Sequence, residues 1–324
     1  MPDPVAVKEA PQRPVELRRL VSEVERVFHG KGDVVRHAAA ALLARGHILF
    51  EDVPGVGKTT LAHALAGSLG LSFQRVQFTS DLLPSDVLGV SVFDPRTSEF
   101  EVRPGPIFTN ILVADEINRA PPRTQSGLLE AMQEGQVTID DQTMALPRPF
   151  LVMATQNPLE HHGTYPLPES QMDRFLMRLT IGYPSREAER QILEESREFT
   201  SVESRVKPVL TVREIEELQG AVDGIHADPT VVDYLMSIVR ATRSDPRIRL
   251  GVSPRGAVGL FRAARARALI EGRDYLIPDD VRSLSVPCLA HRVIPQGTTA
   301  ATTEAHEESA ALVEDIADSI DVPL

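Results

Sequence analysis

The chain is organised around one glycine-containing loop, Val53-Pro54-Gly55-Val56-Gly57-Lys58-Thr59-Thr60. An apolar run from His47 to Glu51 precedes the loop and predicts a short buried strand, and a helical pattern follows over Thr59 to Ser68. Between a strand and a helix, glycines let backbone N–H groups turn toward phosphate oxygens, and the helix N-terminus attracts negative charge. Lys58 is then expected to reach the β- and γ-phosphates of a nucleotide, and the Thr59 hydroxyl to coordinate Mg²⁺. The loop departs from the usual pattern only at Asp52, where a first glycine is common.

Two acids follow the next fully apolar strand, which is predicted over Ile111 to Asp115. Ligands of open parallel sheets bind at the carboxyl ends of the strands, where Asp115 and Glu116 would lie. Asp115 is suited to hold the water shell of Mg²⁺, and Glu116 to polarise a water for attack on the γ-phosphate. A further strand over Phe150 to Thr155 leads to Asn157, whose amide would orient that water unless it serves only as a turn residue before Pro158.

Two arginines allow more than one interpretation. Ser253 and Pro254 are typical of a helix start, so Arg255 lies in the first helical turn, where an anion such as a nucleotide phosphate would offset its repulsion from the helix dipole. The alternative for Arg255 is an exposed, solvated side chain. Arg174 lies where a short helix gives way to the last predicted strand, Phe175 to Tyr183. The local sequence alone favours an ion pair of Arg174 with Asp173 or a role as a helix C-terminal cap.

Strands that alternate with helices predict a parallel α/β sheet covered by helices on both faces. A strand over Phe73 to Phe78 and a helix over Thr124 to Glu134 complete this pattern. Two segments, about 80–106 and about 136–146, carry paired β-like runs around polar turns and predict projecting hairpins. Because such hairpins bury little core, contact with a partner or a substrate is their expected use.

Helical patterns replace the strands after residue 184. We therefore predict two domains: an α/β nucleotide-binding domain over 1–184 and a small all-helical lid over 185–324, which ends in an acidic tail. The tail, from Thr298 to Leu324, reads either as a peripheral helix or as a frayed end.

Composition narrows the classes of function. The chain has 324 residues, 42% of them hydrophobic, and a net charge of −12, so the global field disfavours nucleic acid and anionic membranes as partners. Its single cysteine, Cys288, excludes an internal disulfide framework and fits a cytoplasmic protein. No apolar run approaches the length of about 18 residues that a membrane-spanning helix needs.

Several motifs together resemble the MoxR family of AAA+ ATPases over about residues 15 to 290. In chain order they are Glu51-Asp52-Val53-Pro54-Gly55-Val56-Gly57-Lys58-Thr59, Phe78-Thr79-Ser80-Asp81-Leu82-Leu83-Pro84-Ser85-Asp86, Asp115-Glu116-Ile117-Asn118-Arg119-Ala120-Pro121, Gly163-Thr164-Tyr165-Pro166-Leu167-Pro168-Glu169, Asp173-Arg174-Phe175 and Ser253-Pro254-Arg255.

The resemblance implies ATP and Mg²⁺ as ligands and gives each motif a role. Lys58 and Thr59 would be the Walker A ligands, Asp115 and Glu116 the Walker B pair, Asn157 sensor 1 and Arg255 sensor 2. Arg174 would be an arginine finger that reaches the γ-phosphate bound by the next subunit of a homo-oligomeric ring, usually a hexamer. The segment from Val27 to Gly30, with Phe28, would enclose the adenine, and the two hairpins would be the helix-2 insert and the hairpin before sensor 1, facing the axis of the ring.

The implied function is ATP hydrolysis that remodels a client protein complex and so assists its maturation or activation, often with a von Willebrand factor A domain protein as partner. The alternatives are a magnesium-chelatase-like motor subunit, a DNA-acting motor or transcription activator, and an adaptor that binds ATP without turnover. The acidic charge disfavours the DNA-acting motor, and Glu116 disfavours the adaptor. His161 and His162, adjacent in a loop, are expected to be solvated rather than to bind a metal, because neighbours in an extended chain point apart.

Overall fold

A computed structural model describes residues 13–53, 55–157, 163–195, 205–297 and 303–323. Its centre is a parallel sheet of five strands in the order β2-β5-β8-β1-β9. The strands are β1 (Ile48–Glu51), β2 (Phe73–Gln77), β5 (Ile111–Asp115), β8 (Leu151–Gln156) and β9 (Met177–Leu179). The predicted α/β sheet is therefore confirmed, with all strand neighbours parallel.

The last strand is much shorter than the predicted Phe175 to Tyr183. β9 ends at Leu179, and the backbone N–H groups of Ile181 and Gly182 each donate a 2.7 Å hydrogen bond to Oδ2 of Asp52. Because a side chain captures these N–H groups, they are not available for a strand ladder, and the chain leaves the sheet here.

Helices cover both faces of the sheet because strand side chains alternate between the faces. Ile48 and Phe50 of β1 pack in the same core as α1 (Arg13–Glu25), α2 (Gly32–Leu43) and α3 (Lys58–Ser68). Leu49 points to the other face, where it shares a second core with α5 (Pro122–Glu134).

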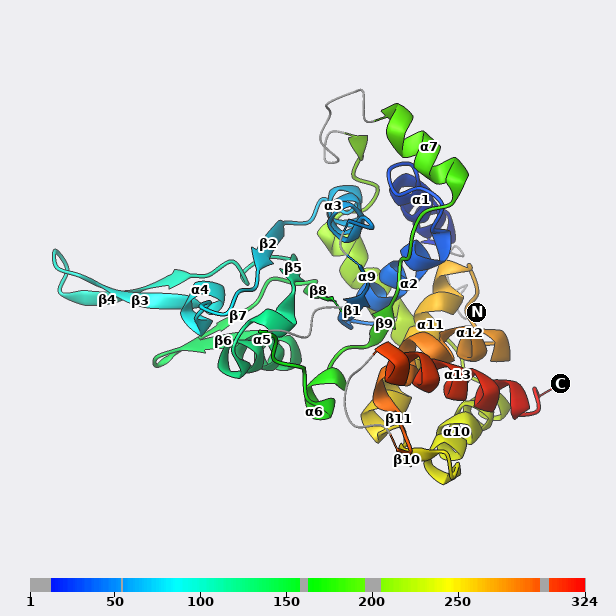
Figure 1. The fold of residues 1–324 in the computed structure, drawn as a ribbon. Helices are drawn as coiled ribbons and strands as arrows, with labels where there is room; N and C mark the ends of the chain where they lie inside the picture. Colours follow the sequence, from blue (N-terminus) through cyan, green and yellow to red (C-terminus); the bar gives the residue numbers. More distant parts are fainter. Residues whose placement is uncertain (1–12, 54, 158–162, 196–204, 298–302, 324) are drawn as a thin grey trace, which may run out of the picture.

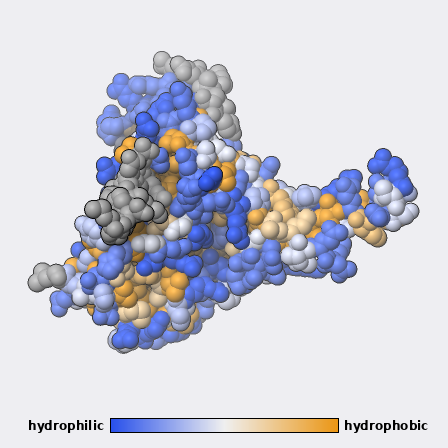
Figure 2. Space-filling view, turned by 180° about the vertical axis from the view of Figure 1, so that it is seen from behind, coloured by the Kyte–Doolittle hydropathy of each residue, from blue (hydrophilic) through white to orange (hydrophobic). Residues whose placement is uncertain are grey.

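Two antiparallel hairpins project from the α/β part of the fold, as predicted (Figure 1). One is formed by β3 (Gly89–Asp94) and β4 (Glu99–Pro104), which follow the short helix α4 (Pro84–Leu88), and the other by β6 (Gln136–Ile139) and β7 (Gln142–Ala145). Figure 1 shows both hairpins projecting from the same side of the molecule, β3–β4 much farther than β6–β7. The space-filling view in Figure 2 shows hydrophobic residues along the longer arm and hydrophilic ones at its tip.

The C-terminal part is a helical lid, as predicted. It contains α7 (Arg186–Glu195), α9 (Val212–Asp223), α10 (Pro229–Ser244), α11 (Pro254–Ile270), α12 (Pro278–Leu289) and α13 (Thr303–Ser319). The expectation of a purely helical domain is corrected in one detail, because β10 (Ile248–Leu250) and β11 (Ile294–Pro295) form a short antiparallel pair. Within the described residues, no helix has the length and apolar character needed to cross a bilayer.

In its described residues, 303–323, the acidic tail forms a packed helix, α13, rather than a frayed end. Leu312, Val313 and Ile316 of α13 are buried in the core that also contains the lid helices. Their spacing of one, three and four residues places them on one face of the helix, so that the acidic residues occupy the other face.

The lid and the sheet share this core. α1 and α2 lie against α11, as Figure 1 shows, and buried side chains of α2, α9 and α11 join those of β1 and β5 in one hydrophobic cluster. The division near residue 185 stays a prediction: α7 begins at Arg186, but one hydrophobic cluster extends through both predicted domains.

Candidate active site

The glycine-containing loop has the backbone geometry that phosphate binding needs. Gly55 and Gly57 have φ angles of +84° and +96°, in the left-handed region that side chains rarely adopt. A Cβ atom at Gly57 would also lie 3.1 Å from a ring carbon of Phe28. Lys58 begins α3 directly after the loop, so the unpaired N–H groups of the first helical turn face the same space. Pro54 lies outside the described residues.

Predicted site residues from the loop and from the ends of two strands line one cavity of about 350 Å³. Its walls are formed by the loop and by the carboxyl ends of β2, β5 and β8. The lining residues are Gly55, Gly57, Lys58, Thr59, Thr60, Arg75, Gln77, Asp115, Glu116, Thr155 and Asn157. The cavity thus brings together side chains that are distant in the sequence, at the sheet edge where ligands of parallel sheets bind.

Asp115 is buried and fixed by two neighbours. The Thr155 hydroxyl donates a 2.8 Å hydrogen bond to one carboxylate oxygen, and Arg75 donates to the other at 2.7 Å. Thr59 lines the same cavity, so the site contains two residues with oxygen donors of the kind that Mg²⁺ prefers. In the part of the chain that the structure describes, no three His, Cys, Asp or Glu side chains group as a protein-only metal site. The donor set fits Mg²⁺, which usually takes one or two carboxylates and completes its shell with phosphate and water.

Glu116 follows Asp115 in a left-handed backbone conformation, with φ of +55°. Its N–H group donates a 2.8 Å hydrogen bond to the Thr155 hydroxyl, which fixes the turn at the end of β5. Its carboxylate accepts a 2.8 Å hydrogen bond from the Gln77 amide and pairs with Arg119 at 2.8 Å. The predicted base is therefore held by two side chains in this conformation.

Lys58 is held close to the loop entrance. Its ammonium donates a 2.9 Å hydrogen bond to the backbone carbonyl of Asp52. Burial lowers the pKa of Lys58, while the carboxylates of Asp52, Asp115 and Glu116 act in the opposite direction. A side chain that can leave one carbonyl for a stronger acceptor is suited to meet incoming phosphate oxygens.

A second cavity, of about 290 Å³, opens on the other side of the loop and shares Gly55, Gly57 and Thr60 with the first. It is lined by Val27, Phe28, His29, Lys31, Val56, Ile181, Gly182, Pro184, Ile192, Glu195 and Arg205 as well. Phe28 and Val56 supply buried apolar surface beside the loop, as a nucleotide base requires.

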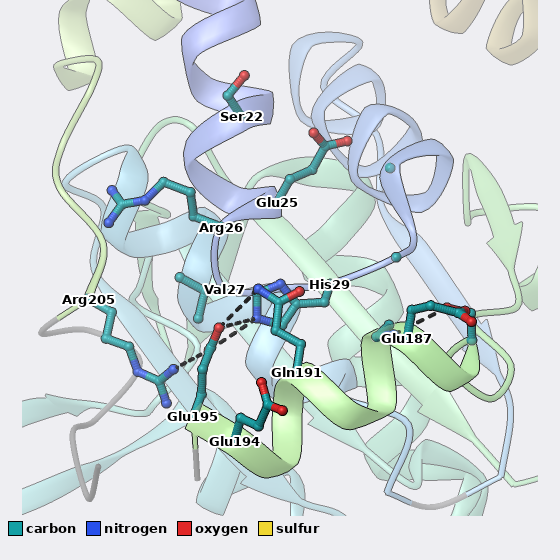
Figure 3. Close-up of a pocket in the computed structure, with 14 residues that line it drawn as sticks. Ser22, Glu25, Arg26, Val27, His29, Glu187, Gln191, Glu194, Glu195 and Arg205 are labelled. Atoms are coloured by element: carbon teal, nitrogen blue, oxygen red, sulfur yellow. Dashed lines mark hydrogen bonds and ion pairs between the residues drawn. The ribbon is translucent and has the colours of Figure 1, made fainter. Parts of the chain in front are cut away.

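A larger cavity of about 1090 Å³ adjoins it between α1 and α7 and is shown in Figure 3. His29 and Glu195 meet there at 3.1 Å, and Arg205 donates to Glu195 at 2.9 Å, which links the turn after α1 to the end of α7. Gly30 lines this cavity with φ of +75° and approaches α7 so closely that a Cβ would lie 2.9 Å from that of Ala188.

The two arginines lie apart from both loop cavities. Arg255, in the first turn of α11, is half-exposed and lies 3.7 Å from Asp173. Ser253 caps this helix through the N–H of Gly256, as predicted, and its hydroxyl also donates to Asp173. Arg174 donates a 2.7 Å hydrogen bond to the carbonyl of Leu129 in α5, not to Asp173. The local sequence favours an ion pair between Arg174 and Asp173, but in the structure Arg292 pairs with Asp173, at 2.7 Å.

The sequence does not predict four residues as part of the site: Asp52, Arg75, Gln77 and Thr155. Asp52 accepts hydrogen bonds from the backbone after β9, and the other three contact Asp115 or Glu116. Gln77 and Thr155 end or nearly end their strands, so the rule that ligands gather at carboxyl ends would have found them. Nothing in the sequence marks Arg75, which is paired with Asp115 across neighbouring strands. His161 and His162 lie outside the described residues.

Two family models match parts of this chain. Residues 47–177 match the family model described as the ATPase family associated with various cellular activities (AAA), and residues 240–316 match the AAA lid domain. The second match includes most of α13, so the likeness extends farther toward the C-terminus than the motifs indicated.

Relatives of similar length are found among curated proteins and solved structures. An uncharacterised protein of Bacillus subtilis, YeaC, is 52% identical over 86% of this chain and 87% of its own. The chaperone MoxR1 of Mycobacterium tuberculosis is 42% identical over 86% of this chain and 75% of its own. The crystal structure of a candidate ATPase from Cytophaga hutchinsonii superposes with a TM-score of 0.86 at 34% identity and covers 96% of both chains.

Proposed function

The chain belongs to the MoxR family of AAA ATPases, and from this premise we propose that it hydrolyses ATP and uses the energy to remodel client protein complexes. One observation carries the proposal. Lys58, Thr59, Asp115, Glu116 and Asn157, from a loop and two strand ends, line the same cavity. This arrangement supports phosphoryl transfer to water, in which positioning and electrostatic stabilisation supply most of the catalysis.

ATP would lie across the loop, with its phosphates in the cavity of about 350 Å³ and its base beside Phe28, in the cavity of about 290 Å³. The residues from Val53 to Thr60 would cradle the phosphates with backbone N–H groups, and Lys58 would move from the Asp52 carbonyl to the phosphate oxygens. Thr59 and Asp115 would hold Mg²⁺, which neutralises charge on the phosphates when it is bound.

Glu116 would act as the general base. Its carboxylate must accept a proton from the attacking water, so it must first leave its contacts with Gln77 and Arg119. Asn157, buried at the end of the neighbouring strand, would orient the same water. Bound nucleotide and the surrounding subunits are the signals that would release Glu116.

Arg174 and Arg255 are proposed to complete the site from outside. Arg255 would approach the phosphates when the lid closes, since it is half-exposed and its first-turn position favours an anion nearby. Arg174 would reach the ATP of the next subunit, which requires a homo-oligomer, and a hexameric ring is the proposed state. Arg174 does not line the cavity of its own chain, as expected for a finger that acts between subunits.

The β3–β4 arm and the β6–β7 hairpin are the proposed contacts with the client. On one face of the arm, Phe93 and Phe100 lie opposite each other in the ladder, half to two-thirds exposed, with ring centroids 5.3 Å apart. Exposed aromatic pairs of this kind are typical of protein interfaces. A von Willebrand factor A domain protein is the proposed class of partner, and a cytoplasmic location is proposed with it.

The proposal is tested with Glu116→Gln, which keeps the shape of the base but cannot accept the proton. We expect ATP to bind with unchanged affinity and phosphate release to fall at least about a hundredfold, the lower bound for loss of a general base. Lys58→Ala is the matched control, in which ATP binding itself is expected to be lost. Affinity capture with the ATP-loaded Glu116→Gln protein, compared with Lys58→Ala, should then retain the client. Unchanged turnover in Glu116→Gln would remove Glu116 from the base role.

A further inference from the structure

Glu51, the last residue of β1, is joined to the far end of the chain. One carboxylate oxygen lies 2.5 Å from Nδ1 of His306 in α13, and the other accepts a 3.0 Å hydrogen bond from Arg178 of β9. The Glu51 and Arg178 side chains are each 10% exposed and that of His306 is 15% exposed. The three elements thus meet at a nearly buried cluster of charged and polar groups directly before the phosphate loop.

Glu51, Arg178 and His306 are joined by several hydrogen bonds. The second terminal nitrogen of the Arg178 guanidinium donates a 3.1 Å hydrogen bond to the backbone carbonyl of His306. Burial raises the pKa of Glu51, but hydrogen bonding to His306 and the charge of Arg178 outweigh it, so the net pKa is lowered. Glu51 is therefore held ionised, and loss of the His306 contact leaves a buried carboxylate with one partner fewer.

The neighbouring residue makes a second tether. Asp52 binds the N–H groups of Ile181 and Gly182, from which the chain runs to α7 and the lid, and its carbonyl accepts from Lys58. Two consecutive carboxylates at the entrance of the phosphate loop thus hold the two ends of the C-terminal part, its beginning through Asp52 and its last helix through Glu51.

Other ion pairs fix α13 to the lid and not to the sheet. Arg282 of α12 pairs with Asp318 at 2.6 Å, and Arg247 pairs with Asp315 at 2.8 Å. Both pairs are about half-exposed or more, and both lie farther along α13 than His306. Removing one of these pairs is therefore a control for removing the His306 contact: α13 loses an ion pair of similar chemistry, but one that does not lead to the phosphate loop.

We propose that His306 is a positioning residue for the nucleotide site: through Glu51 it makes the docking of α13 and the binding of ATP at the phosphate loop mutually dependent. The inference rests on the proposed binding of ATP at this loop. If docking of α13 favours the loop conformation that binds ATP, then bound ATP must favour docking of α13 by the same factor, because coupling between two sites is reciprocal.

The test uses the full chain in a Glu116→Gln background, so that ATP is bound but not consumed. The affinity for fluorescently labelled ATP is measured for His306→Ala, His306→Asn and Arg282→Ala. We expect His306→Ala to weaken binding about tenfold, within the range of measured couplings between sites. His306→Asn should stay within about twofold of the parent, because its amide nitrogen can donate to Glu51 in place of Nδ1. Arg282→Ala should leave the affinity unchanged.

Hydrogen exchange of residues 303–319 provides a second readout that needs no substitution in α13. Saturating ATP should slow exchange there in the parent and not in Lys58→Ala, since the second protein lacks the phosphate ligand. Equal ATP affinity in His306→Ala and its parent, equal weakening by Arg282→Ala, or exchange that ATP does not alter would each overturn the inference while the ATPase proposal stands. Failure of the parent itself to bind ATP would overturn the proposed function and the inference with it.

Discussion

The side-chain amide of Gln77 donates a 2.8 Å hydrogen bond to Oε2 of Glu116, the carboxylate that is proposed to activate water. Gln77 ends β2 and Glu116 follows β5, so neighbouring strands of the sheet set their distance. The hydrogen bond directs Oε2 toward β2, and the side chain must break it before it can turn toward an attacking water. The contact therefore restrains the base in the conformation seen here.

Gln77→Ala should consequently raise basal ATP turnover. We expect an increase of about two- to tenfold, the range that the net worth of one hydrogen bond allows, with little change in ATP affinity. Phosphate release and labelled-ATP binding measure the two quantities. Gln74→Ala is the matched control, since Gln74 is an exposed glutamine of the same strand. A lower basal rate in Gln77→Ala would show that Gln77 assists the reaction rather than restraining it.

Two inactive proteins should recover activity when mixed, if Arg174 acts between subunits. Arg174→Ala should bind ATP normally but lose at least about a thousandfold in turnover, as loss of an arginine finger does elsewhere. Glu116→Gln lacks its base but keeps its finger, so a Glu116→Gln subunit can complete the site of an Arg174→Ala neighbour. Mixed assemblies should therefore release phosphate faster than either variant alone.

The mixing experiment has an outcome that favours the local contact of Arg174 with the Leu129 carbonyl. If Arg174→Ala keeps full turnover, or loses thermal stability in proportion to its activity, Arg174 holds α5 in place and is not a finger. A Glu116→Gln and Lys58→Ala mixture is the control, because both of those proteins lack function in their own site and should stay inactive together.

Asp52→Gly restores the residue that such loops usually carry and should nonetheless destabilise the protein. The change leaves the buried N–H group of Ile181 and the partly buried one of Gly182 without their acceptor, at a cost of about 1–3 kcal/mol. Chemical denaturation measures the free energy of unfolding. Asp141→Gly, in the exposed turn of the β6–β7 hairpin, should stay within about 0.5 kcal/mol of the parent. Equal stability of both variants would contradict a structural role for Asp52.

The stability of the protein should fall as pH decreases from about 6.5 to 4. Burial lowers the pKa of His47 to about 4, below its ordinary value of 6.5, so in this interval the unfolded chain binds a proton that the folded chain does not. Nδ1 of His47 accepts from the Val152 N–H, and Nε2 donates to the Met132 carbonyl, so protonation removes an acceptor. The loss over the whole interval is about 3 kcal/mol for His47.

His47→Asn isolates this contribution. Its free energy of unfolding should depend less steeply on pH between 6.5 and 4.5 than that of the parent, whatever its stability at neutral pH. His37, whose burial also lowers its pKa to about 4, is present in both proteins and contributes equally to both slopes. Identical slopes would exclude His47 as the source.

Substitution of the aromatic pair on the β3–β4 arm should separate client binding from the fold. Phe93 and Phe100 are largely exposed, so Phe93→Ser with Phe100→Ser should change stability by less than about 1 kcal/mol and leave basal ATP turnover intact. Capture of the client by the ATP-loaded Glu116→Gln protein should be lost. Glu101→Ser, on the opposite face of the same arm, should capture normally. Equal capture of the client by the parent, by the double phenylalanine variant and by Glu101→Ser would show that the aromatic face does not contact the client.

The sequence predicts the sheet, both hairpins and the lid because each depends on local patterns. Apolar runs such as Ile111 to Asp115 are bounded by turn residues, and Ser253 with Pro254 predicts a helix start that the structure confirms, with Ser253 as the cap and Pro254 as the first helical residue. Candidate site residues that follow a strand or a glycine loop, such as Lys58 and Asp115, could be named for the same reason. Their catalytic roles remain proposals.

Contacts between distant segments could not be predicted. Glu51 and His306 lie 255 positions apart, and neither stands in a motif that names the other. The end of β9 is predicted too late because the acceptor for Ile181 and Gly182 is the side chain of Asp52, which follows β1 and which no local pattern near β9 reveals. Arg174 shows the same limit, since its partner in α5 depends on how helix and strand pack.

The hydrophobic cluster that joins α1, α2 and the lid helices to one face of the sheet limits how this protein can be dissected. A fragment that stops near residue 184 would lose the partners of α1 and α2 and would expose the apolar faces of both helices to water. We expect such a fragment to aggregate when it is expressed alone, and the 324-residue chain to melt in a single cooperative transition. Work on isolated parts should therefore retain α9 and α11, whichever half is under study.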